Sequence, residues 1–130
     1  MSLIYLESSI VIYLVERHPL YSSRIEHALA EVKGATLATS RLVELEVLVK
    51  PLQEGRAETA ALYRDFLSAM QLLPITDETF ERALSLRVLH RLKTPDALHL
   101  ALAQQYSCER FWTNDSRLGT AAGSSTNILL

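Results

Sequence analysis

Short apolar runs alternate with segments of helical periodicity along the chain, and this alternation restricts the fold more than any other feature. Runs able to form strands occupy residues 3–7, 35–38, 72–75, 110–113 and 127–130. Strands that alternate with helices favour a parallel sheet that is covered on both faces and joined by right-handed crossovers. We therefore expect an α/β protein of three layers, in which helices flank a central parallel sheet.

Predicted helices separate these strands. They cover residues 9–17, 25–34, 41–49, 56–71, 77–90, 94–106 and a short segment that follows Asp115. We expect Thr39 or Ser40 to cap the third helix, Pro51 to end it, and Asp77 to cap the fifth. A chain of 130 residues is long enough to bury a sizeable core, so we expect one domain over residues 1–130.

The charge and the cysteine content argue against several classes of protein. Thirteen Lys and Arg against fifteen Asp and Glu give a formal net charge of −2, which argues against non-specific coating of DNA. The single cysteine, Cys108, excludes an internal disulfide and a cysteine-based zinc site. No stretch approaches the roughly 20 apolar residues of a membrane span, and no signal peptide is visible. We expect a cytoplasmic protein that does not enter a membrane.

Acidic residues stand where strands end and helices begin. Glu7 and Asp115 each follow a predicted strand, and ligands of α/β folds lie beyond the carboxyl ends of strands. Each acid also has a purely structural explanation, because Glu7 could cap the next helix, Asp115 could do the same, and the helix dipole favours Asp96 at its position. Taken singly, these acids do not establish a site.

Two further positions remain ambiguous from periodicity alone. Glu44 and Glu46 fall on opposite flanks of an apolar stripe in the third helix, and Lys50 could form an ordinary ion pair with Glu46. His99 lies three residues after Asp96, which would suit a metal pair. A packed or hydrogen-bonded histidine on a mostly apolar helix is the favoured interpretation of His99.

Four segments, in order, resemble the PIN-domain ribonucleases, above all the VapC-type toxins of prokaryotic toxin–antitoxin pairs. They are IYLESSIVIYL (4–14), ATSRLVELEVLVKPL (38–52), TPDALHLALA (94–103) and FWTNDSRL (111–118). Each motif is weak alone, but the ordered set is specific and spans nearly the whole chain.

The resemblance implies a sheet order and a set of site residues. The order is 3-2-1-4-5, which places the first and fourth strands side by side. The family's four acids correspond to Glu7, Glu46, Asp96 and Asp115. Glu46 is selected over Glu44 because the family's acid follows its small hydroxyl residue, here Ser40, by six positions. Ser9 and Asn114 correspond to supporting residues beside the first and last acids.

The resemblance also implies an activity and partners. Four close carboxylates repel one another and need a cation, and an all-oxygen ligand set suits Mg²⁺ or Mn²⁺. The implied reaction is metal-dependent hydrolysis of RNA by an endoribonuclease that leaves a 5′-phosphate and a 3′-hydroxyl. Among the basic residues near the motifs, we single out Arg117 as an RNA-binding candidate. The implied partners are an antitoxin protein and a second copy of the chain.

Glu7 departs from the family pattern, which usually has Asp at this place. Glutamate is longer by one methylene, roughly 1.5 Å, whereas Mg²⁺ holds its ligands at about 2.0–2.1 Å with little tolerance. One alternative is therefore a catalytically weak or silent PIN fold that binds RNA or protein. A third hypothesis, a different metal-dependent phosphoesterase such as a structure-specific DNA nuclease, ranks last because the chain lacks extra acids and long insertions.

Overall fold

A five-stranded parallel sheet forms the centre of the molecule in the computed structural model, which describes residues 2–123 and 126–128. The strand order is β3-β2-β1-β4-β5, as the resemblance implied. The strands are β1 (Leu3–Leu6), β2 (Thr36–Thr39), β3 (Gln71–Leu72), β4 (Arg110–Thr113) and β5 (Thr126–Ile128). The predicted α/β fold with a central parallel sheet is therefore confirmed.

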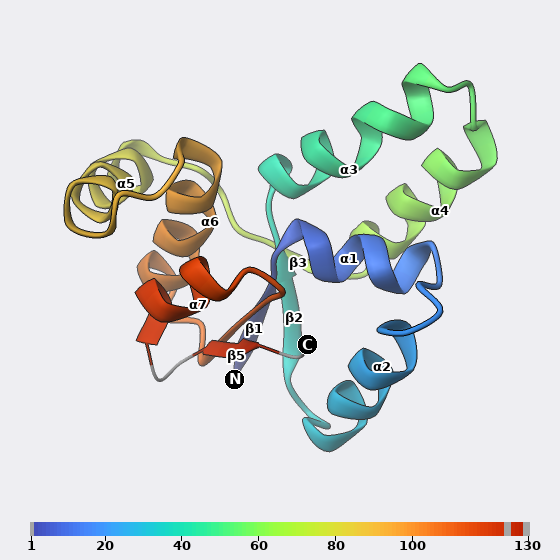
Figure 1. Ribbon diagram of the computed structural model, residues 1–130, viewed down its shortest axis with the longest axis horizontal. Helices are drawn as coiled ribbons and strands as arrows, with labels where there is room; N and C mark the ends of the chain where they lie inside the picture. The colour runs from blue at the N-terminus through green and yellow to red at the C-terminus, as the bar shows by residue number, and fades with distance from the viewer. Residues whose placement is uncertain (1, 124–125, 129–130) are drawn as a thin grey trace.

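Helices cover both faces of this sheet. They are α1 (Ser8–Val15), α2 (Ser22–Glu31), α3 (Arg41–Gln53), α4 (Ala57–Ser68), α5 (Asp77–His90), α6 (Thr94–Gln105) and α7 (Ser116–Ala122). Figure 1 shows α5 and α6 on one side of the sheet and α1, α2 and α4 on the other. Within the described ranges, no helix combines the length and the apolar character that a membrane span requires.

The winding of the sheet reverses at β1, the central strand. Tyr5 is paired with Ala38 of β2 on one side and with Phe111 of β4 on the other. Just beyond the end of β1, the backbone N–H of Glu7 donates to the carbonyl oxygen of Trp112 at 3.0 Å. This register sets Glu7 beside the last residues of β4, at the reversal point where α/β folds bind ligands.

The core explains why these segments fold as they do. Tyr5, Leu6, Phe111 and Trp112 on the two central strands are at most 1% exposed, in keeping with strands that are covered on both faces. Ile10 of α1 is also fully buried against this core. The site described below therefore stands on the most deeply buried part of the sheet.

Some predicted element ends were wrong. Pro51 lies inside α3, which continues to Gln53, because a proline in the last turn removes only one helical hydrogen bond and leaves the rest of the helix intact. Asp77 is the first residue of α5 rather than its cap; the N-cap is Thr76, whose N–H donates to Thr79 Oγ1 at 2.9 Å. The last strand begins at Thr126, and the predicted strand residues 129–130 lie outside the described residues.

Candidate active site

The four predicted acids come from four different elements that meet at the carboxyl edge of the sheet. Glu7 directly follows β1, Asp115 precedes α7, Asp96 is in the first turn of α6, and Glu46 is in the first half of α3. Burial raises the pKa of Asp96, and the negative charges of Asp115, Glu7 and, more weakly, Glu46 raise it further. The other three carboxylates therefore lie close enough to Asp96 to act on it electrostatically.

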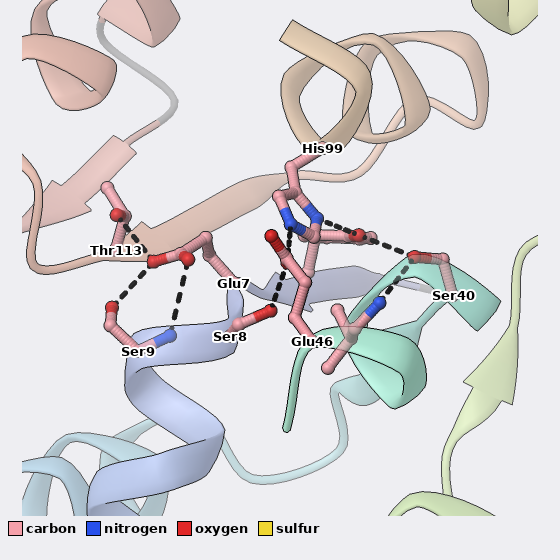
Figure 2. A network of polar contacts seen from close by, with 9 residues as sticks. Glu7, Ser8, Ser9, Ser40, Glu46, His99 and Thr113 are labelled. Atoms are coloured by element: carbon pink, nitrogen blue, oxygen red, sulfur yellow. Dashed lines mark hydrogen bonds and ion pairs between the residues drawn. The ribbon is translucent and has the colours of Figure 1, made fainter. Parts of the chain in front are cut away.

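Glu7 is held by three hydrogen bonds (Figure 2). Its Oε2 accepts from the backbone N–H of Ser9 at 3.2 Å. Glu7 therefore caps α1, the structural role considered for it above. Its Oε1 accepts from Ser9 Oγ at 2.5 Å and from Thr113 Oγ1 at 2.9 Å. The longer glutamate side chain therefore reaches the last residue of β4, the neighbouring strand.

Two hydroxyl groups connect Glu7 to the loop that carries Asp115. Thr113 Oγ1 also accepts from the backbone N–H of Asp115 at 3.0 Å, and Ser9 Oγ accepts from the N–H of Asn114 at 3.3 Å. The side-chain amide of Asn114 donates to Tyr13 Oη at 2.8 Å. Ser9 and Asn114 thus lie where the resemblance implied, and their contacts fix the position of the loop between β4 and α7.

Glu46, not Glu44, faces this site. Oε1 of Glu46 bonds with Nε2 of His99 at 2.5 Å and accepts from Ser8 Oγ at 2.7 Å, whereas Glu44 pairs with Arg41 at 3.0 Å. Burial acts to raise the pKa of Glu46, but the hydrogen bond and charge of His99 and the bond from Ser8 outweigh it, so the pKa is lowered. Glu46 is therefore a carboxylate whose orientation is fixed by neighbours on α1 and α6.

A small cavity of about 60 Å³ joins Asp96 and Asp115. It is also lined by Leu92, Lys93 and Arg117. Asp115 caps α7, because its Oδ1 accepts from the backbone N–H groups of Arg117 and Leu118 at 2.9 and 3.2 Å. The cavity thus brings together two of the predicted acids, the predicted RNA-binding arginine and one further cation.

The donor set suits a hard divalent cation more than zinc, because all four acids offer oxygen. Burial and then the neighbouring negative charges raise the pKa of Asp96, and a bound cation would relieve the repulsion between these charges. As placed, however, the side chains of the described ranges form no group of three or more His, Cys, Asp or Glu in metal-binding geometry. A cation that binds three of these acids therefore requires carboxylates to rotate from the positions seen.

Sequence reasoning missed several polar residues of the site. Thr113 and Ser8 bond Glu7 and Glu46, and Tyr5 bonds His99 from the middle of a buried strand. A signal existed for Thr113, since it ends a strand beside an acid, and the favoured interpretation of His99 as a hydrogen-bonded residue is confirmed. The role of Tyr5 could not be predicted, because a tyrosine in a buried strand is usually there for packing alone.

Solved structures with this fold include a toxin–antitoxin complex and a toxin. A toxin–antitoxin complex from Klebsiella pneumoniae is 24% identical over 98% of this chain and 96% of that chain, with a TM-score of 0.76. VapBC2 from Rickettsia felis, bound to a DNA fragment from its promoter, is 18% identical over 96% and 97%, with a TM-score of 0.78. Mycobacterium tuberculosis VapC20, a sarcin–ricin loop cleaving toxin, is 18% identical over 92% and 95%, with a TM-score of 0.75.

Sequence comparisons point to one family. Comparison with curated proteins gave no significant match. The family model of the PIN domain matches residues 4–123, nearly the whole chain, and the expected resemblance is thereby confirmed. The chain therefore belongs to the PIN domain family.

Proposed function

We propose that this protein is a divalent-metal-dependent endoribonuclease and the toxin of a type II toxin–antitoxin pair. The observation that carries the proposal is the electrostatic coupling of Asp96 to Glu7, Glu46 and Asp115 at the carboxyl edge of a PIN fold. PIN-domain nucleases generally use divalent metal ions. The VapC20 structure, described as that of a sarcin–ricin loop cleaving toxin, supports RNA as the substrate.

In the proposed mechanism, Glu7, Glu46, Asp96 and Asp115 would hold Mg²⁺ or Mn²⁺. Such a cation would supply positive charge for the phosphate oxygens and would acidify a water. Ser9 bonds Glu7 and the N–H of Asn114, and it thereby keeps Glu7 and Asp115 at fixed positions relative to each other.

Substrate binding is assigned to cations at the rim of the acidic site. Arg117 and Lys93 line the same small cavity as Asp96 and Asp115 and would offset the repulsion between these acids and an RNA phosphate. We propose that Arg117 contacts the RNA backbone next to the scissile phosphate.

We propose that Glu7 is an adapted ligand and not a damaged one. Its extra methylene is used, because Oε1 lies 2.9 Å from Thr113 Oγ1 on the next strand. The alternative, a silent module that binds RNA or protein, is favoured by the same three hydrogen bonds, since they occupy both Glu7 oxygens with donors of the chain itself. A Glu7→Asp variant separates the two: higher activity would indicate a damaged site, and lower activity an adapted one.

We further propose a cytoplasmic toxin that pairs with an antitoxin and forms a homodimer. The Klebsiella and Rickettsia complexes support an antitoxin partner. Phe80, Leu84 and Val88 lie one turn apart on α5 and are 57%, 60% and 76% exposed, which supports burial of this face against a second copy.

The test is cleavage of a mixed RNA pool by purified protein without antitoxin, in Mg²⁺, in Mn²⁺ and in EDTA. Asp96→Asn removes a proposed ligand, and Asp65→Asn on exposed α4 is the matched control. We expect cleavage by the wild type and the control that is lost in EDTA and in Asp96→Asn. Cleavage that survives EDTA would contradict the metal dependence, and absence of cleavage by folded protein in both metals would favour the silent module.

A further inference from the structure

A buried chain of hydrogen bonds leads from the start of α3, across β1, to the carboxylate of Glu46 (Figure 2). Ser40 Oγ lies 2.9 Å from Tyr5 Oη, Tyr5 Oη lies 2.7 Å from Nδ1 of His99, and Nε2 of His99 lies 2.5 Å from Glu46 Oε1. Ser40, Tyr5 and His99 are fully buried, whereas the side chain of Glu46 is 32% exposed. The chain therefore joins the protein interior to an acid that faces the site.

The carboxylate of Glu46 sets the direction of the bond between it and His99. Glu46 is a carboxylate and can only accept, so Nε2 of His99 carries the hydrogen and donates. At the other side of the ring, Nδ1 of His99 is bonded to Tyr5 Oη, a phenol that burial keeps protonated by raising its pKa. Tyr5 Oη is also bonded to Ser40 Oγ, whose oxygen accepts from the N–H of Val43 at 3.4 Å.

All bonds to Glu46 reach the same oxygen. His99 Nε2 and Ser8 Oγ both bond Oε1, and within residues 2–123 and 126–128 no hydrogen bond is described for Oε2. Two donors from different helices thus fix the carboxylate plane and leave one oxygen for a ligand. A fully buried histidine needs partners for both ring nitrogens, and one of the partners of His99 is a carboxylate of the proposed site.

We propose that His99 is a positioning residue, which holds Oε1 of Glu46 so that Oε2 faces the cation of the proposed nuclease site. The proposal rests on the proposed function. Tyr5 and Ser40 fix the ring in turn: the tilted contact between the rings of Tyr5 and His99, with centroids 5.7 Å apart, and the bond to Nδ1 together set its rotation. His99 itself contacts neither substrate nor cation in this account.

Two substitutions of His99 separate positioning from packing. The amide nitrogen of Gln can take the place of Nε2 and still donate to Glu46, whereas the amide of Asn reaches only the place of Nδ1. We expect His99→Asn to weaken Mn²⁺ binding and to lower kcat by about 10- to 100-fold, the usual effect of losing an outer-shell partner, with little change in KM for RNA. His99→Gln should recover most of both losses.

Three readouts decide the outcome. Mn²⁺ affinity is measured by electron paramagnetic resonance, kcat and KM by cleavage of a labelled RNA, and the His99 tautomer by long-range ¹H–¹⁵N NMR. Fluorescence of buried Trp112 verifies that each variant is folded. Absence of hydrogen from Nε2, or equal Mn²⁺ affinity in wild type and folded His99→Asn, would overturn the positioning role. Wild-type protein that binds Mn²⁺ but does not cleave RNA would refute only the proposed function, because the Mn²⁺ affinities of the variants still test the role of His99. Wild-type protein that neither binds Mn²⁺ nor cleaves RNA would refute the proposed function and the positioning role together.

Discussion

Thr113 offers a sharp test of the hydrogen-bond network around Glu7. Its hydroxyl is fully buried, donates to Glu7 Oε1 at 2.9 Å and accepts from the N–H of Asp115 at 3.0 Å. Thr113→Val keeps the shape and β-branching of the side chain but removes both bonds. We expect a less stable protein, because the partly buried carboxylate of Glu7 loses one of its three donors.

The expected loss can be worked from the structure. A hydrogen bond to a charged group contributes about 1.5–3 kcal/mol. The lost bond from the N–H of Asp115, an exposed residue, adds less than about 1 kcal/mol because water can replace the hydroxyl. The total is roughly 2–4 kcal/mol in the free energy of unfolding. For a chain of 130 residues this corresponds to a fall in thermal midpoint of roughly 8–15 °C.

The matched control is Thr39→Val, at the last residue of β2. Thr39 is 3% exposed, and its hydroxyl has no hydrogen-bond partner within the described part of the chain. The same substitution there should leave stability unchanged or raise it slightly, because an unpaired buried hydroxyl costs free energy. The assay is urea unfolding of metal-free protein, followed by fluorescence of Trp112, the only tryptophan. Equal changes in the two variants would refute the network.

Three further outcomes are expected. Asp96→Asn should raise the thermal midpoint of metal-free protein at pH 7 while abolishing cleavage. The pKa of Asp96 is higher in the folded than in the unfolded chain, so the wild type should gain stability as pH falls through that pKa. Calorimetry should therefore find that the difference in thermal midpoint between variant and wild type shrinks with falling pH. Burial raises the pKa of the Cys108 thiol to about 11, so iodoacetamide should alkylate it at pH 8 about 100-fold more slowly than a free cysteine, and a comparable rate by mass spectrometry would contradict this. Leu84→Glu on exposed α5 should convert a dimer into a monomer in light scattering, whereas an unchanged dimer would place the interface elsewhere.

The sequence specified the elements better than the contacts between them. Apolar runs located the described ends of all five strands to within three residues, and the predicted strand 110–113 matches β4 at both ends. The prediction that Pro51 ends the third helix was wrong, because a proline in the last turn of a helix does not terminate it. The sheet order required the family resemblance, since alternation alone does not say which strands are neighbours.

The polar contacts of the site depend on register across the sheet. Thr113 and Glu7 are 106 positions apart, and Tyr5 and His99 are 94 apart, so no local pattern links them. Periodicity left Glu44 and Glu46 open and the resemblance selected Glu46, whereas the contacts of Glu46 with His99 and Ser8 had no signal in the sequence. Such pairs become visible only when the packing of α1, α3 and α6 on the sheet is known.

The most direct test of the four-acid site is anomalous diffraction from crystals soaked in Mn²⁺, recorded at the manganese absorption edge. We expect an anomalous peak bonded to carboxylate oxygens of Glu7, Asp96 and Asp115, with Glu46 facing it, and no such peak in Asp96→Asn crystals. The absence of a peak among these four acids at saturating Mn²⁺, or an unchanged peak in the variant, would contradict the account.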